Sequence, residues 1–174
     1  MQVGGHITRL FAIGSLVLLL GGAQPTRAAN SVSGTVGATA LTPISVVESG
    51  TQHMNFGMFV PGTVADTIVL TPAGARSNPG GHVQFLGAGV QADLFTVTGD
   101  TNYPTFGITL PSTAVTIISG ANNMTVDTFT STPSGSGTLS SGTLNVTVGA
   151  TLHVGANQAS GSYSGNYNFT VAYQ

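Results

Sequence analysis

The chain has 174 residues but only three Lys or Arg and five Asp or Glu residues, and it has no cysteine. With so few cations it cannot neutralise a run of phosphates, which argues against nucleic acid as a partner. The same shortage excludes the polybasic patches that attract proteins to anionic lipid. Because disulfides are also excluded, burial and the hydrogen-bonded backbone must stabilise the fold.

The first 28 residues are predicted to be a secretory signal peptide. Arg9 precedes the apolar run LFAIGSLVLLLGG at residues 10–22. This run is shorter than the roughly 20 residues of a membrane-spanning helix and fits the core of a signal. We expect cleavage between Ala28 and Ala29. Cleavage after Ala29 ranks second, because Arg27 would then lie where a small residue is preferred.

The expected mature chain runs from residue 29 to residue 174, a usual size for one domain with a hydrophobic core. It contains one basic residue, Arg76, against five acids, a formal charge of −4. No integral membrane segment is expected in it. We predict a bacterial exported protein that is located in the periplasm, on the cell surface as part of a fimbrium, or outside the cell.

The mature chain begins with the uncharged segment ANSVSGTVGATA, residues 29–40. Every second residue is small or β-branched, which is the period of a β-strand. These positions are Val32, Gly34, Val36, Ala38 and Ala40. We expect a free N-terminal strand, followed by a folded domain at residues 41–174.

Alternating apolar residues recur through that domain and predict about nine short strands. In chain order, the positions are Met54, Phe56, Met58; Val64, Ile68, Leu70; Val83, Phe85; Phe95, Val97; Phe106, Ile108, Leu110; Val115, Ile117; Met124, Val126; and Leu144, Val146, Val148, Ala150, Leu152, Val154. Turn-rich segments at 60–63, 71–81 and 131–137 separate some of them. The pattern favours an all-β fold, a single antiparallel β-sandwich of the immunoglobulin-like type. A closed barrel is the second choice.

The chain ends in the alternating stretch GSYSGNYNFTVAYQ, residues 161–174. One face carries Gly161, Tyr163, Gly165, Tyr167, Phe169, Val171 and Tyr173. An uncharged apolar strand at a sheet edge attracts other strands unless something covers it. Either this strand lies in the middle of its own sheet, or it accepts the free strand 29–40 of another copy. Repeated without closure, the second arrangement gives a fibre.

We find no motif for catalysis, for a cofactor or for a metal ion. His53, His82 and His153 lack the spacing of a metal site, and the acids occur singly along the chain. No G-x-S-x-G turn presents a serine as a nucleophile. We therefore expect that the protein is not an enzyme and that it has no cofactor.

The C-terminus resembles that of chaperone–usher pilins. Tyr173 is the penultimate residue, Gly161 is fourteenth from the end, and apolar residues alternate between them. The resemblance implies that a periplasmic chaperone binds this strand, and that the N-terminal extension of the next subunit, delivered at an outer-membrane usher, then replaces the chaperone. Unlike many such pilins, this chain has no cysteine.

Residues 41–173 resemble a family of secreted bacterial proteins, the domain of unknown function family 4402. The resemblance rests on MNFG at 54–57, PGT at 61–63, DLFTVTGD at 93–100, YPTFGITLP at 103–111, and the closing stretch at 148–173. The family has no established activity. The resemblance implies a pilin-like domain, with kinship to fimbrial and spore-coat-type subunits.

The function expected from the sequence is that of an exported structural subunit. Copies of it would assemble by donor-strand addition into a surface fibre or coat. The alternative is a self-contained secreted adhesin or carbohydrate-binding module, whose loops at 71–81 and 131–142 would present Ser, Thr, Asn and Gly to a ligand.

Overall fold

The computed structural model describes residues 29–174; the predicted signal peptide and Ala28 lie outside the described residues. The chain divides into two units, residues 1–38 and residues 39–174. Residues 29–38 contain no strand, and the side chains of Val32 and Val36 are 96% and 101% exposed. In the part of the chain described, no helix has the length and hydrophobicity to cross a membrane.

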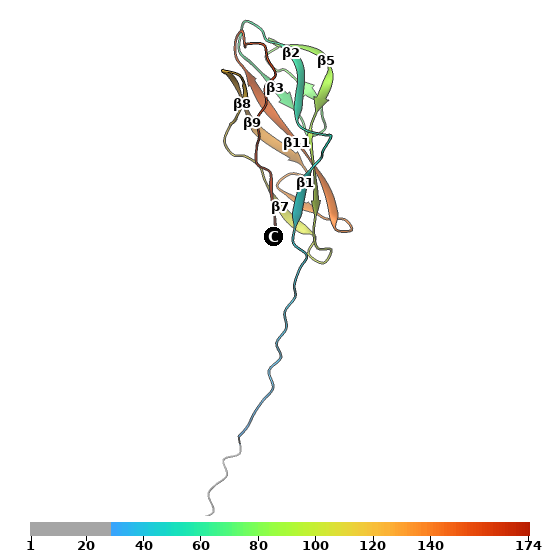
Figure 1. Ribbon diagram of the computed structural model, residues 1–174. Coiled ribbons are helices and arrows are strands. Elements are labelled where there is room, and N and C mark those ends of the chain that lie inside the picture. The colour runs from blue at the N-terminus through green and yellow to red at the C-terminus, as the bar shows by residue number, and fades with distance from the viewer. Residues whose placement is uncertain (1–28) are drawn as a thin grey trace, which may run out of the picture. The chain divides into compact units, whose positions relative to one another are not determined.

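Residues 39–174 form an all-β domain, and every strand pairing is antiparallel (Figure 1). This confirms the all-β, antiparallel part of the predicted fold class; the strands form three sheets. The strands are β1 (Ser45–Glu48), β2 (Asn55–Val60), β3 (Asp66–Leu70), β4 (Arg76–Ser77), β5 (Gln84–Gln91), β6 (Asp93–Thr98), β7 (Thr105–Thr109), β8 (Val115–Ser119), β9 (Asn122–Thr132), β10 (Ser136–Thr138), β11 (Thr143–Val154) and β12 (Thr170–Tyr173). Residues 29–174 thus contain twelve strands rather than about nine, because strands as short as β4 and β10 have no readable alternation.

The twelve-residue strand β11 organises the largest sheet, which has seven strands. Its first half pairs with β6 and its second half with β3, while β9 pairs along 147–153. The register of β9 shifts at a bulge between Gly149 and Thr151. A Cβ added to Gly149 would collide with the carbonyl oxygen of Leu70. Glycine is therefore required where the end of β3 approaches this bulge.

Two smaller sheets complete the domain, β10–β7–β12 and β2–β5. Their side chains and those of the large sheet share two core clusters. One cluster is centred on Ile68, Val126 and Leu152, and partly buried residues of β2 and β5 pack against it. The other combines residues of β6 and β11 with Phe106 of β7. The predicted alternation of β11 is confirmed, because Val146, Val148, Ala150, Leu152 and Val154 are all at most 2% exposed.

The final strand is shorter than predicted. Only residues 170–173 form β12, which pairs with β7. Upstream, Ser164 forms an isolated bridge with Ile118 of β8. The chain therefore changes from a partner in the large sheet to a partner in the three-stranded sheet, and residues 165–169 form no ladder between them. The predicted alternation continues along this stretch. Half-buried residues lie between exposed neighbours at Tyr163, Tyr167, Phe169, Val171 and Tyr173.

We predict that Phe106→Ala destabilises the domain by about 3–5 kcal/mol, the usual loss for a buried phenylalanine. Phe106 is fully buried, and its ring packs so closely on Gly137 that a Cβ there would lie 2.6 Å from it. Urea unfolding of residues 29–174 measures the change. Tyr103→Ala is the control, because Tyr103 is 52% exposed. Equal losses for the two variants would contradict the placement of this core.

Asp66 accepts hydrogen bonds from the loop that precedes β5. We predict that the stability of the domain depends on whether the Asp66 carboxyl group is ionised. Its carboxylate accepts hydrogen bonds from the backbone N–H groups of His82 (2.7 Å), Thr67 (2.7 Å) and Gly80 (3.1 Å). These bonds, that of His82 first, lower the pKa of Asp66 below its ordinary value of 3.8. A lowered folded-state pKa stabilises the protein above the unfolded-state pKa, and this stabilisation is lost as the pH falls through the lower folded-state value.

Asp66→Asn is accordingly expected to lower the thermal midpoint at neutral pH and to reduce its further fall below about pH 4. Thermal unfolding monitored by circular dichroism across this range measures both effects. Asp127→Asn is the comparison variant: the bond from His153 also lowers the pKa of Asp127, so this variant should alter the acid profile as well, but it removes no bond to a loop backbone. Acid profiles of Asp66→Asn that coincide with those of the unmodified chain would refute the assignment.

Candidate functional site

The domain has an open edge formed by the unpaired edges of β1 and β12, two strands of different sheets that contact each other. Each of these strands has one hydrogen-bonded neighbour among the described residues, β6 for β1 and β7 for β12. Both flank the same core cluster, which is packed by Ile44 and Val46 on one side and by Phe169 and Val171 on the other. Two strands from different sheets thus border one apolar core without pairing to each other. This is a ready template for a further strand.

Tyr173 closes one end of the open edge. Its hydroxyl group donates a hydrogen bond to the carbonyl oxygen of Thr42 (2.7 Å), just before β1, and accepts one from the N–H of Asp100 (2.6 Å). The C-terminus lies beside β7 and near the start of β1 (Figure 1). The penultimate tyrosine therefore connects β12 to the chain that enters β1.

Of the predicted acceptor residues, Tyr167, Phe169 and Val171 pack against the core cluster at this edge. The ring of Phe169 stacks on Phe95 at 4.2 Å between centroids, and Tyr167 contacts the rings of both Phe95 and Phe129. Tyr163 packs against the other core cluster. Its hydroxyl donates to the carbonyl oxygen of Ala159 (2.7 Å).

Gly161 is exposed, at the start of the C-terminal stretch. The predicted donor residues, Val32, Gly34, Val36, Ala38 and Ala40, are likewise exposed and belong to no strand. The predicted cleavage position after Ala28 lies at the boundary of the described residues, with Ala29 the first of them.

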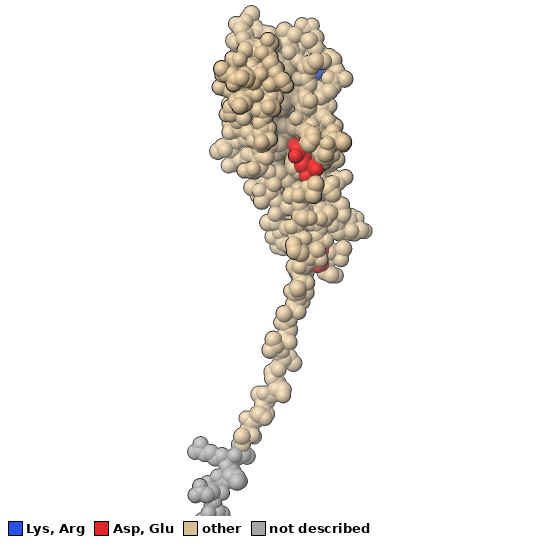
Figure 2. Space-filling view, viewed as in Figure 1, with Lys and Arg blue, Asp and Glu red and all other residues tan. Residues whose placement is uncertain are grey.

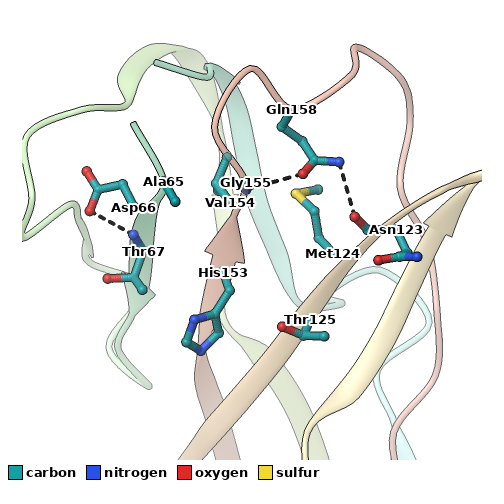
Figure 3. A pocket seen from close by; sticks show the side chains of 10 residues that line it. All are labelled: Ala65, Asp66, Thr67, Asn123, Met124, Thr125, His153, Val154, Gly155 and Gln158. Carbon is teal, nitrogen blue, oxygen red and sulfur yellow. Dashed lines mark hydrogen bonds between the residues drawn. The ribbon is translucent and has the colours of Figure 1, made fainter. Parts of the chain in front are cut away.

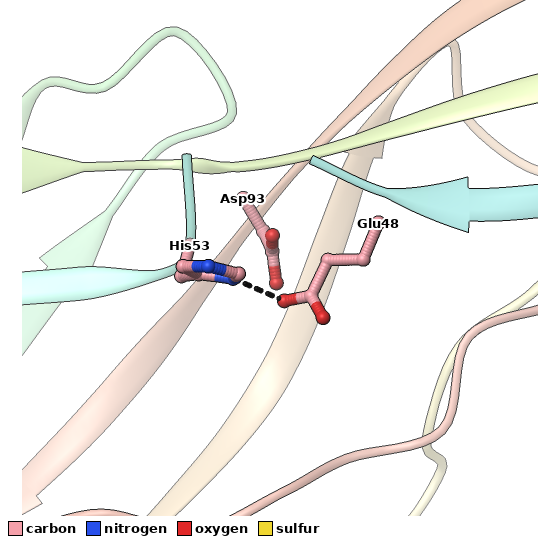
Figure 4. Close-up of side chains that lie close together, drawn as sticks. All are labelled: Glu48, His53 and Asp93. Atoms are coloured by element: carbon pink, nitrogen blue, oxygen red, sulfur yellow. Dashed lines mark hydrogen bonds and ion pairs between the residues drawn. The ribbon is translucent and has the colours of Figure 1, made fainter. Parts of the chain in front are cut away.

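Beside the open edge, three ionisable side chains converge whose positions in the sequence form no recognisable motif: Glu48, His53 and Asp93 (Figure 4). One ligand atom from each lies within 4.8 Å of the others, and the Nδ1 atom of His53 is 2.8 Å from the Oε1 atom of Glu48. Figure 2 shows a larger acidic patch, a smaller acidic area and one basic spot on an otherwise uncharged face.

The backbone explains how these three residues meet. Glu48 is the last residue of β1 and lies opposite Phe95 of β6. Asp93 is on the same face of β6 as Phe95, because it lies two residues earlier. The loop after β1 returns along β6 through the bonds Ser49 N–H to Leu94 O (2.8 Å) and Leu94 N–H to Gln52 O (3.3 Å). The next residue, His53, is thereby placed beside both carboxylates.

Asp93 is the unusual member of this cluster, because it is only 1% exposed. Its carboxylate accepts hydrogen bonds from the Tyr167 hydroxyl (2.7 Å) and from the N–H of Leu94 (3.0 Å). Burial raises the pKa of Asp93, and the bond from Tyr167 only partly opposes this shift. Burial, followed by the bond to Asp93, raises the pKa of Tyr167. The bond to Glu48 raises the pKa of His53.

Within residues 29–174, no lysine or arginine lies beside these carboxylates. Arg76 is the one basic residue of the chain from residue 29 onward. It is engaged elsewhere, because its guanidinium donates to the carbonyl oxygens of Phe56 (2.6 Å) and Met58 (3.2 Å) and lies 4.0 Å from the ring centroid of Phe85. Only His53 is placed to offset the charge of the cluster.

The sequence contains one signal for this cluster, which a search for metal-ligand spacing misses. In DLFTVT, Asp93 has the same parity as Phe95 and Val97, so a carboxylate falls on the buried face of a strand. Such a group must find partners within the fold. Which partners it finds depends on the pairing of β1 with β6, and that register is not readable from composition or alternation.

A hollow of about 460 Å³ lies between the ends of β3, β9 and β11 (Figure 3). Its polar lining includes Asp66, Asn123, His153 and Gln158. Gln158 donates to the carbonyl oxygen of Asn123 (3.1 Å) and to the Tyr163 hydroxyl (2.9 Å), while His153 pairs with Asp127 at 2.9 Å. These polar groups are already engaged in hydrogen bonds and an ion pair within the chain. We therefore assign them a structural role rather than a role in ligand binding.

Comparison with known protein families identifies the domain. A family model described as "Domain of unknown function (DUF4402)" matches residues 44–173, which include every strand of the domain. Searches among curated proteins and among solved structures returned no significant match. The predicted resemblance to family 4402 is therefore confirmed, and the chain belongs to the family described as Domain of unknown function (DUF4402).

Proposed function

We propose that this chain is an exported, pilin-like structural subunit, copies of which add strands to one another to form a fibre or coat on the bacterial surface. The observation that carries the proposal is the open edge, where β1 and β12 border one apolar core without pairing to each other. In this proposal the domain acts as an incomplete β-sandwich, and a strand from the next copy completes it.

The chain carries a segment with the chemistry to fill that edge. Residues 29–40 are uncharged and contain no proline, so their backbone N–H groups are free to join a ladder. Val32 and Val36 lie on one face of the segment if it is extended, and both are exposed. In strand addition, backbone hydrogen bonds supply affinity and alternate side chains enter pockets. The two valines would pack against Val46 and Phe169, partly buried residues of the core cluster at the open edge.

Strand addition between copies is heterologous, because one end of a copy enters the edge of the next, and without closure it produces a filament. An apolar edge that waits for a donor is also prone to aggregation. Export and assembly would therefore require a partner that covers the edge. A periplasmic chaperone and an outer-membrane usher fit this role, as the resemblance of the C-terminus to pilins implies.

Deletion of residues 29–40 is expected to abolish self-association of the chain 29–174 and to leave a less stable domain with an uncovered edge. Light scattering measures the size distribution of the two proteins, and thermal unfolding measures their stability. A synthetic peptide of residues 29–40, added to the truncated protein, should raise its unfolding midpoint. If both proteins are stable monomers and the peptide has no effect, the proposal fails.

Point variants test whether association requires the valine-bearing face of residues 29–40, and not only the presence of the segment. Val32→Asp with Val36→Asp would force two carboxylates into an apolar groove without partners, and we expect assembly to be lost. The matched control is Ser33→Asp with Thr35→Asp, which adds the same charge on the opposite face of the extended segment. Equal losses in the two double variants would show that charge, rather than insertion of the valines, governs association.

The alternative function, a secreted adhesin or carbohydrate-binding module, is tested with the same truncated protein. Binding of this monomer to a glycan array, together with a stable monomeric chain 29–174, would favour the alternative.

A further inference from the structure

We propose that Glu48, His53 and Asp93 form a binding site for a divalent transition-metal ion of the zinc type. This site adjoins the open edge through Glu48, but its three ligands come from β6, the last residue of β1 and the loop that follows β1, and none belongs to the donor segment 29–40. The ligand atoms, within 4.8 Å of one another, surround a single position. Figure 4 shows the three side chains pointing toward this position.

The donor set selects the class of ion. One imidazole nitrogen and two carboxylate oxygens suit zinc, which binds such atoms at about 2.0–2.2 Å. Calcium takes six to eight oxygen ligands, and three residues of which one is histidine do not supply them. Binding would draw the ligand atoms closer together than they are here. The Glu48 and His53 side chains, 47% and 57% exposed, are free to make that adjustment.

Asp93 is the ligand whose position is fixed by the surrounding structure. It is buried and is held by two hydrogen bonds, from the Tyr167 hydroxyl and the Leu94 N–H. Each carboxylate oxygen retains a lone pair after accepting one bond. A hydrogen bond that orients a ligating carboxylate is a usual feature of metal sites and contributes to their affinity. Tyr167 takes this positioning role here.

Charge balance also favours a cation at this position. Two carboxylates face one histidine, Asp93 is withdrawn from water, and the only basic side chain from residue 29 onward is bound to β2 and β5. A buried carboxylate is costly unless a partner compensates its charge. A dication would neutralise both carboxylates at once, which a protonated His53 alone does not achieve.

The test is zinc binding by the chain 29–174, measured by isothermal titration calorimetry, with calcium chloride as the comparison. We expect one Zn²⁺ per chain and no comparable binding of Ca²⁺. Glu48→Gln, His53→Gln and Asp93→Asn should each weaken zinc binding at least about 10-fold, the lower bound seen even for residues that only orient ligands. Tyr167→Phe should weaken it less than loss of a ligand does.

The chain supplies its own matched control. His153 and Asp127 form a second histidine–carboxylate pair at 2.9 Å, similarly exposed but without a third ligand. His153→Gln and Asp127→Asn should leave zinc affinity unchanged. Circular dichroism verifies that each variant is folded. The proposal is overturned if the unmodified chain binds no zinc at millimolar concentration, or if the control variants lose affinity while folded variants of the three ligands retain it.

Assembly is measured separately. The valine double variant of residues 29–40 retains Glu48, His53 and Asp93 and should bind zinc normally even if it does not associate. The ligand variants can likewise be scored for oligomer size. Failure of the metal proposal and failure of the strand-addition proposal therefore give different results.

Discussion

The structure depends on the burial of one face of β11. This strand lies in the middle of the seven-stranded sheet and pairs with β6, β3 and β9. Its inward residues extend from one core cluster to the other, with Leu152 in the first and Val146 in the second. In a domain without disulfides, this shared face is what joins the two clusters into one folded unit.

The border of the second cluster is not closed by backbone pairing. This cluster is bordered by β1 and β12, which contact each other without forming a ladder. Aromatic stacking of Phe95 with Phe169 and the bonds of the Tyr173 hydroxyl hold the C-terminal stretch in place instead. Side-chain contacts thus fix this border while its backbone groups remain available. That combination suits an edge to which another strand is added.

In the Glu48–His53–Asp93 cluster, the carboxylates have no lysine or arginine partner, because the domain carries very few charged residues. On a surface with many ions, a pair of carboxylates would be balanced by lysine or arginine nearby. Here the single arginine from residue 29 onward packs on Phe85, and Asp93 is buried with Tyr167 as its hydrogen-bond donor. The cluster thus brings three ionisable side chains together on a domain with few charges, and Glu48 connects it to β1 at the open edge.

The sequence by itself determined the all-β class and the inward faces of strands such as β6 and β11, because a period of two reports which side chains share a face. The same alternation grouped Met58 and Val64 with inward residues, and they are 62% and 51% exposed. It indicated the parity of the C-terminal stretch from Tyr163 to Tyr173, but not that only residues 170–173 pair with β7. Only the tertiary structure decided that crossing, the open edge, and the meeting of Glu48, His53 and Asp93. Alternation carries no information about register, and these features depend on which strands pair and how they are aligned.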